Sequence, residues 1–414
     1  MKYEPIFDHE FSKYINIDES FEFNNKFYNK FDPLTKEKVN VCIVGVFDPY
    51  WSSNTSFSRA LQKREDIGEV TEFDYRKCMK TKYNSIVNNI QELSRNCDLM
   101  FIMKGNGIPV QAIKLASSNC LIYHWFPDWF PMFKQHKELF EISRYCHYRS
   151  ATGWENAKLW SEKINLPVFH VFDGADPFFY FPTGDKKIYD FTFIGGIDTE
   201  RKTVYEFLKK QGIKVSFFGP GFTKFVEPGE WRKICSQSKI TLNLSRGNYK
   251  GYSSKRLWDL GSCGSMVITK KIESMETYMN LKEKIHIVTF SNLINLKNLI
   301  TFYLENEEER KKIAKNFREF VLKYRTWDNS VNNILNIVRN NEGFSMRTDL
   351  AVDKESLKIY NDKYKKPKLR KISKEKQKRI NRAIRIEQTY TTDSRRVKSK
   401  KSNNNSKKSK GFRI

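Results

Sequence analysis

Short, nearly continuous apolar runs alternate with amphipathic stretches along most of the chain. Residues 39–46 (VNVCIVGV) have the composition of a buried parallel strand. A helix is predicted from about Thr55 to Lys63, with Asn54 as its N-cap. Further strands are predicted near residues 70–73, 98–103, 120–124 and 168–172, with helices between them. Repeated alternation of this kind indicates a doubly wound parallel sheet.

The alternation is interrupted once, by a Pro- and Gly-containing segment suited to a linker, residues 173–182 (DGADPFFYFP). It resumes with strands predicted near residues 190–194, 214–218, 240–244, 266–269 and 285–288. A long charged helix, residues 307–324, and a last helix follow. We therefore predict an α/β protein with two Rossmann-like doubly wound parallel-sheet domains that face each other across a cleft. The predicted divisions are an extension (1–38), an N-terminal domain (39–169), a linker (170–182), a C-terminal domain (183–326), a terminal helix packing back toward the first domain (327–345) and a tail (346–414).

Charge separates the tail from the rest of the chain. The 414 residues carry a net charge of +26, and residues 346–414 hold 24 Lys and Arg against 7 Asp and Glu. With few apolar residues, this segment is predicted to be largely disordered. One interpretation is attachment to nucleic acid or another anionic surface. The alternatives are a solubilising tail without a specific partner, or a localisation signal.

Cysteine usage and the first residues bear on the compartment. The chain has seven cysteines, no C-x-x-C pair, no start resembling a signal peptide, and no apolar run of about 18 residues that would suggest a membrane span. We expect a soluble cytoplasmic protein without a zinc site or a transmembrane segment.

Glycines follow two of the predicted strands in the second half. In residues 190–201 (DFTFIGGIDTER), a buried strand runs into Gly195 and Gly196, and a helix begins near Thr199. Such a turn lets the backbone approach a phosphate, and Arg201 in the first helical turn adds a charge. Gly219 repeats the arrangement one unit later. The alternative is a tight turn that needs glycine only for its geometry.

Residues 240–269 (ITLNLSRGNYKGYSSKRLWDLGSCGSMVIT) carry the densest group of candidate polar residues. A Lys/Arg pair at a helix start can neutralise a diphosphate, and a carboxylate one turn later can accept hydrogen bonds from a ribose diol. The alternative is an ordinary ion pair between Arg256 and Asp259. The candidate donor-binding residues here are Asn243, Ser245, Lys255, Arg256, Asp259 and Gly264.

The run RLWDLGSCGSMVIT resembles the signature of the group-1 glycosyltransferases, especially the branch named for spore maturation proteins. Residues 150–182 and 307–327 are similar to that family's inter-domain stretch and its terminal helix. The resemblance implies the GT-B fold and a nucleotide-sugar donor, with a UDP-linked sugar favoured. It places Asp259 at the nucleotide ribose, and Arg201 with Lys255 or Arg256 at the diphosphate. Many members have a glutamate that contacts the donor sugar where this chain has Gly251.

On the N-terminal side, His124 ends a predicted strand and Asp128 follows it. Either residue is a candidate to orient the acceptor or to act as a base. The alternative is that His124 is packed in an aromatic cluster. Asn54 and residues 104–107 are weaker candidates for the same cleft.

The absence of a D-x-D motif favours transfer without a metal or other cofactor, and no P-loop or G-x-S-x-G motif is present. The predicted function is metal-independent sugar transfer to an acceptor that can be a glycan, a protein or a nucleic acid. The alternatives are a glycosyltransferase-like binding protein that acts through its tail, or a transferase for modified nucleic acid.

Overall fold

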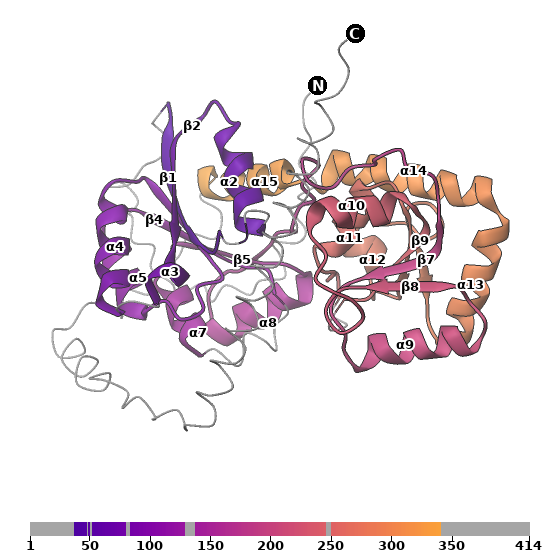
Figure 1. Cartoon of the computed structure of the whole chain (residues 1–414). Coiled ribbons are helices and arrows are strands. Elements are labelled where there is room, and N and C mark those ends of the chain that lie inside the picture. Colours follow the sequence, from indigo (N-terminus) through magenta and orange to yellow (C-terminus); the bar gives the residue numbers. More distant parts are fainter. Residues whose placement is uncertain are drawn as a thin grey trace, which may run out of the picture. The chain divides into compact units, whose positions relative to one another are not determined.

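The computed structural model describes residues 37–47, 49, 52–79, 83–128, 137–245 and 250–340. Residues 1–36 of the predicted N-terminal extension and the whole predicted basic tail lie outside these residues. The described part contains two parallel sheets, one of six strands and one of five (Figure 1). This confirms the prediction of two Rossmann-like halves.

The first sheet has the strand order β2-β1-β3-β4-β5-β6, and every pairing is parallel. Alternate residues of β1 point to opposite faces, so that Cys42 and Val44 belong to one buried cluster and Val41 and Ile43 to the other. Both faces are therefore covered. The elements are β1 (Val39–Gly45), α2 (Ser53–Gln62), β2 (Ile67–Asp74), α3 (Tyr75–Met79), α4 (Tyr83–Arg95), β3 (Leu99–Met103), α5 (Val110–Ala116), β4 (Leu121–Phe126), α7 (Lys137–Arg144), β5 (Tyr148–Ala151), α8 (Trp154–Ile164) and β6 (Phe169–His170).

The second sheet has the order β11-β10-β9-β7-β8, again parallel throughout. The order reverses between β7 and β9, and ligands of open parallel sheets bind at such a switch point, beyond the carboxyl ends of the strands. The elements are β7 (Tyr189–Ile194), α9 (Thr199–Lys210), β8 (Val215–Phe218), α10 (Pro228–Ser236), β9 (Ser238–Asn243), α11 (Arg256–Ser262), β10 (Met266–Lys270), α12 (Met275–Met279), β11 (Val288–Phe290), α13 (Leu293–Glu305), α14 (Glu307–Tyr324) and α15 (Trp327–Arg339).

The chain returns to the first sheet at its last described helix. α14 packs on the second sheet, whereas α15 lies beside α2 and buries Trp327 and Val331 against Phe57 and Trp125 of the first (Figure 1). The change of domain occurs at Thr326, which caps α15 and bridges to Ala175.

Three local predictions were wrong. The N-cap of α2 is Ser52, because the amide of Asn54 instead donates to the Val46 carbonyl. The strand β5 was not predicted, because its buried Arg149, which donates to the carbonyls of Ser143 and Cys146, obscures the apolar pattern. The last strand, β11, begins at Val288, where the predicted strand ends.

Candidate active site

Glycines at the carboxyl ends of β7 and β8 allow two turns of the second sheet to touch. Gly195 donates its N–H to the Phe218 carbonyl, and a Cβ on Gly219 would lie 2.6 Å from the Gly195 carbonyl oxygen. A Cβ on Gly195 would lie 2.9 Å from the ring of Phe193 and 3.0 Å from Arg256. These two glycines are therefore required by packing.

Gly196 differs from its neighbour. A Cβ there would meet only the Pro220 carbonyl, at 3.8 Å. Within the part of the chain that the structure describes, no steric contact explains this glycine. It is the position in the turn where a ligand has room to approach the backbone.

Two arginines converge at the end of β9. Arg201 and Arg256 both donate to the Leu244 carbonyl, at 2.8 and 2.9 Å, and both guanidinium groups lie over the Phe193 ring. Arg201 is only 4% exposed and also donates to the Gly196 carbonyl. Its hydrogen bonds hold the glycine turn against β9, so the geometry gives Arg201 a structural task. Arg256 is more exposed.

Serine and asparagine side chains fix the segment that leads into α11. Asn243 is buried and donates to the hydroxyl groups of Ser253 and Thr269. The hydroxyl of Ser245 accepts the N–H of Ser254 and bonds the Ser253 hydroxyl. Asn243 therefore fixes the segment before α11 to β10. Gly264, with a φ of 72°, serves the turn that follows α11.

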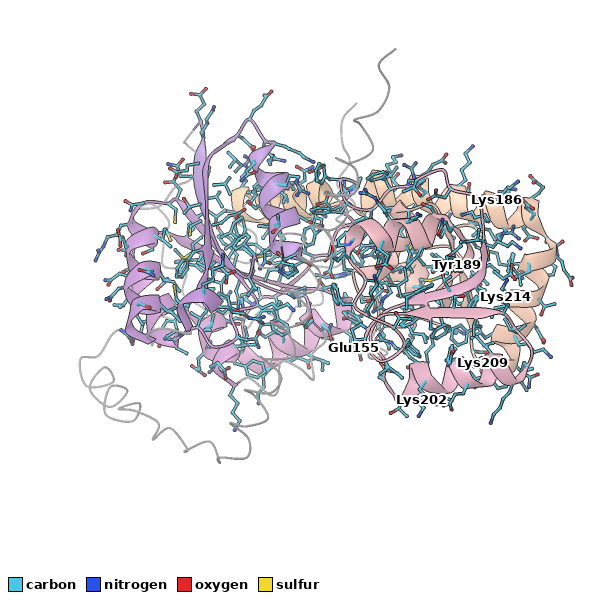
Figure 2. All side chains as sticks on the ribbon, in the orientation of Figure 1. Glu155, Lys186, Tyr189, Lys202, Lys209 and Lys214 are labelled. Atoms are coloured by element: carbon cyan, nitrogen blue, oxygen red, sulfur yellow. The ribbon has the colours of Figure 1, made fainter. Side chains whose placement is uncertain are left out.

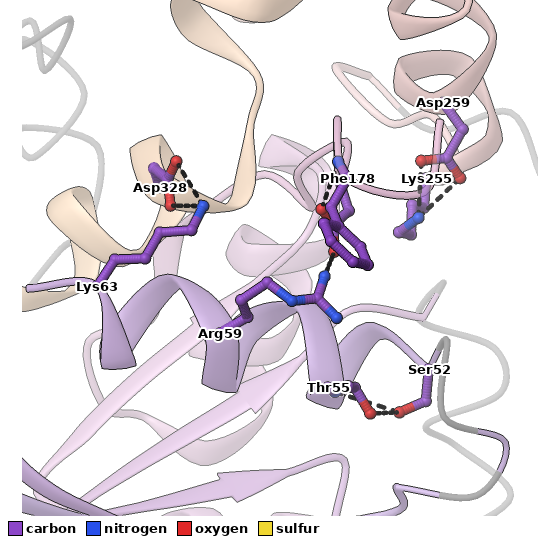
Figure 3. A network of polar contacts seen from close by, with 9 residues as sticks. Ser52, Thr55, Arg59, Lys63, Phe178, Lys255, Asp259 and Asp328 are labelled. Carbon is purple, nitrogen blue, oxygen red and sulfur yellow. Dashed lines mark hydrogen bonds and ion pairs between the residues drawn. The ribbon is translucent and has the colours of Figure 1, made fainter. Parts of the chain in front are cut away.

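Lys255 and Asp259 form the central ion pair of this half. Lys255 Nζ lies 2.7 Å from both carboxylate oxygens of Asp259, one helical turn away (Figure 3). The ammonium group also lies over the Tyr180 ring, at 4.4 Å from its centroid. Burial raises the pKa of Asp259 to about 6, against the opposing effect of Lys255. The pair that forms is this one, and not the Arg256–Asp259 pair considered from the sequence.

An aromatic stack lies beside Gly251, the position at which the resemblance to group-1 glycosyltransferases leads one to look for a glutamate. The rings of Trp154 and Tyr278 stack with centroids 4.5 Å apart. Gly251 has a φ of 64°, and a Cβ there would lie 2.6 Å from Tyr278 and 3.4 Å from Trp154. Position 251 has no room for a glutamate in this arrangement.

The same region joins α8 to the second domain through polar contacts. Glu155, labelled in Figure 2, accepts the backbone N–H of Lys250 at 2.8 Å and donates its own N–H to the Lys250 carbonyl. Lys250 in turn pairs with Glu273. The first turn of α8 is thereby fixed to the segment that precedes α11.

The candidate base His124 is inaccessible. It is fully buried, its Nδ1 bonds the Ser143 hydroxyl at 2.9 Å, and its Nε2 bonds the Lys104 carbonyl at 3.0 Å. Burial lowers its pKa to about 4, so the ring is neutral. The Trp160 ring packs against it edge-on. This geometry corresponds to the packed histidine considered as the alternative.

Asp128, the other candidate, lies at the carboxyl end of β4. It forms an ion pair of 2.7 Å with Lys104, which follows β3, and both side chains are partly exposed. Asn54 ties β1 to α2 instead of lining this edge.

Sequence reasoning missed Asp173 and Thr152, which follow β6 and β5. Thr152 Oγ1 lies 2.5 Å from Asp173 Oδ1. The pKa of Asp173 is about 7, raised mainly by burial and to a smaller extent by Asp128. The hydrogen bond from Thr152 and the charges of Lys255 and Lys104 lower the pKa but do not cancel the effect of burial. These electrostatic partners come from both domains. The position of Asp173 directly after a strand was an available signal, but the Gly and Pro that follow it suggested a linker.

Among the residues that the structure describes, no group of three or more His, Cys, Asp or Glu side chains is placed to hold a metal ion. None of the described helices combines the length and the apolar character needed to cross a membrane.

Comparisons with known proteins give the class of the protein. Residues 201–336, which include the Lys255–Asp259 pair, match the family model described as glycosyl transferase-like. No curated protein sequence matches the chain. The fold is similar to that of Anabaena HepE in complex with UDP-glucose, with a TM-score of 0.55 and 10% identity over 73% of this chain and 100% of that one.

A DNA-modifying β-glucosyltransferase is also similar, with a TM-score of 0.52 and 13% identity over 73% of this chain and 99% of that one. The fold is also similar to that of a T4 phage enzyme in complex with UDP-glucose. The TM-score is 0.50, and the identity is 13% over 72% of this chain and 98% of that one. These likenesses establish the GT-B fold. With the family match, they define the class: the protein is a glycosyltransferase. The branch named for spore maturation proteins stays a prediction.

Proposed function

We propose that the protein transfers a sugar from a uridine diphosphate sugar to an acceptor hydroxyl, without a metal ion. The observation that carries this proposal is the Lys255–Asp259 pair at the switch-point edge of the second sheet. Here a cation for a diphosphate and a carboxylate for a ribose diol lie side by side. The Gly195–Gly196 turn adds a backbone surface that a phosphate can approach.

The diphosphate charge is met by basic side chains in this proposal. Lys255 contributes its ammonium group, and Arg256, anchored on the Leu244 carbonyl, contributes its guanidinium. Cationic donors of this kind form strong hydrogen bonds to phosphate oxygens. Arg201 acts through the turn that it holds, rather than as a diphosphate ligand.

Uridine is the favoured nucleoside because HepE and the T4 phage enzyme, whose folds this chain shares, are both described in complex with UDP-glucose. The sequence resemblance favours the same donor.

DNA is a candidate for the acceptor that carries this hydroxyl. The observation in its favour is the fold likeness to a DNA-modifying β-glucosyltransferase, together with the 24 Lys and Arg of residues 346–414. A hydroxyl group on a DNA base would then accept the sugar.

Thermal unfolding of the full chain, measured in EDTA with UDP, ADP, GDP and CMP, tests the donor site. A ligand at 100 times its Kd stabilises a protein by about 2.7 kcal/mol, and we expect this effect with UDP. Asp259→Asn should remove most of the shift. The matched control is Asp190→Asn. Asp190 also pairs with a lysine at 2.7 Å, but it lies near the amino end of β7, at the edge of the sheet opposite the proposed donor site.

The outcomes separate the alternatives. Stabilisation by UDP that depends on added Mg²⁺ contradicts metal independence. No stabilisation by any nucleotide contradicts the donor site. UDP binding without release of sugar from UDP-glucose to any acceptor, including hydroxyl-bearing DNA, supports the binding-protein alternative.

A further inference from the structure

The segment that joins the two domains places two phenylalanine rings at the surface. Phe178 is 64% exposed and Phe181 is 36% exposed, whereas the two aromatic residues between them are buried. Asp176 fixes this turn, because its side chain accepts the Phe178 N–H at 3.0 Å and its carbonyl accepts the N–H groups of the two residues that follow. The exposed rings are therefore carried by an ordered backbone, which lowers the entropic cost of binding a ligand on them.

A guanidinium group lies over each exposed ring. The Arg59 guanidinium is 4.3 Å from the centroid of the Phe178 ring (Figure 3). The Arg232 guanidinium is 4.4 Å from the centroid of the Phe181 ring. Arg59 is also paired with Asp176, at 2.5 Å, whereas Arg232 has no carboxylate partner among the residues that the structure describes. The charge of Arg232 is therefore available to an anion.

The exposed rings are connected to the proposed donor site through side-chain contacts. Lys255 Nζ, which pairs with Asp259, lies 4.4 Å from the centroid of the Tyr180 ring. The Tyr180 and Phe179 centroids are 6.4 Å apart, and those of Phe179 and Phe178 are 5.2 Å apart. A molecule bound on the exposed rings is therefore next to the proposed donor site.

The chemistry of this surface fits unpaired nucleobases. Bases stack on aromatic rings, and the phosphates between them bind arginine. Phe178 and Phe181 are three residues apart, so their Cα atoms are at most about 11 Å apart, a separation that neighbouring nucleotides of a single strand can span. An apolar protein partner would instead bury the Arg232 charge without an anion, which is unfavourable.

We propose that Phe178 and Phe181, together with Arg59 and Arg232, bind single-stranded DNA by stacking with its bases and hold it beside the donor site. This inference rests on the proposed function and selects DNA as the acceptor. The lysines and arginines of residues 346–414 contribute contacts with phosphates, which do not depend on the bases. Base stacking is the contribution that belongs to the exposed rings.

The test compares two labelled oligonucleotides of equal length by fluorescence anisotropy with the full chain. One is an oligothymidylate and the other is abasic throughout. Both carry the same phosphates, so only the first can stack. Wild type should bind the oligothymidylate more tightly. The double variant Phe178→Ser/Phe181→Ser should lower that affinity about tenfold or more and leave the affinity for the abasic strand close to wild type.

Ile294→Ser/Phe302→Ser is the matched control, because it removes two apolar side chains that are 66% and 45% exposed, both from α13. It should leave both affinities unchanged. Phe178→Trp keeps a ring at the surface and should bind the oligothymidylate at least as tightly as wild type. Each variant should show the wild-type thermal shift with UDP, which reports on the fold and on the donor site.

Three results would overturn the inference: equal affinity of wild type for the two strands, unchanged affinity in the double variant, or an equal loss with both strands. Weaker self-association of the double variant, with unchanged binding of DNA, would assign the surface to a second copy of the chain instead. If wild type prefers the oligothymidylate but no nucleotide stabilises it, the proposed donor site is wrong and the stacking surface stands.

Discussion

Lys255 holds Asp259 by both carboxylate oxygens, each 2.7 Å from Nζ, in a site where Asp259 is only 5% exposed. The ammonium charge is thus directed to a carboxylate. In the proposed donor complex, a bound diphosphate has to draw on the same ammonium group, and the ribose has to bond the same carboxylate. The two contacts of the donor are therefore coupled through one pair.

Replacing Lys255 with methionine should weaken binding of UDP by about tenfold to a hundredfold, since a charge-assisted hydrogen bond contributes about 1.5–3 kcal/mol. Binding of uridine, which has no phosphate, should change much less. Isothermal titration calorimetry with both ligands measures the difference. An equal loss for uridine and UDP would show that Lys255 acts on the fold rather than on the phosphates.

Gly195 and Gly196 form a matched pair of variants. Gly195→Ala should destabilise the protein by about 1–3 kcal/mol because its Cβ meets Phe193 and Arg256. Gly196→Ala should leave the free energy of unfolding within about 0.5 kcal/mol but weaken UDP binding, because its Cβ enters space that a phosphate would use. Urea denaturation and UDP titration of both variants are the measurements. Wild-type affinity in Gly196→Ala would place the donor elsewhere.

The sequence predicted the alternation of strands and helices because buried parallel strands leave continuous apolar runs, as in residues 39–46. It could not predict β5, whose Arg149 is satisfied by carbonyls that only the folded chain brings together. The Lys255–Asp259 neighbourhood follows from helical spacing. The place of Asp173 does not, since it depends on how residues 174–175 pack against the chain at 325–327.

The burial of His124 could not be predicted from the sequence either. A histidine at the end of a strand has the same sequence pattern whether its ring is exposed or buried. His124→Gln should cost about 1–3 kcal/mol of unfolding free energy through its lost hydrogen bonds. The pH dependence of sugar transfer should stay as in wild type. Calorimetric unfolding and a pH profile of kcat/KM check both points, and a pH profile that differs from that of wild type would restore His124 as a candidate base.

Asp173 should also affect stability in a pH-dependent way. Its pKa is about 7 in the folded protein and near 3.8 when unfolded, so the folded state binds the extra proton between these values. Stability therefore falls as the pH rises from about 4 to about 7. Asp173→Asn abolishes this loss, and at pH 8 the variant should be more stable than wild type by about 1–4 kcal/mol. Near pH 5 the difference should be small.

Urea midpoints at pH 5 and pH 8 provide this measurement. A variant that is more stable at pH 8 than wild type would show that the buried carboxylate destabilises the fold when it is ionised. A variant that is less stable at both values would indicate that the carboxylate has a structural role.

The return of α15 to the first domain has a consequence for protein synthesis. Phe57 and Trp125 of the first domain pack against Trp327, which lies some 200 residues later in the chain than Trp125. A ribosome makes about 5–20 residues per second, so these aromatic side chains await their last partner for about ten seconds or longer. In that interval this apolar surface of the first domain lacks its cover, and uncovered apolar surface is prone to aggregation and is bound by chaperones.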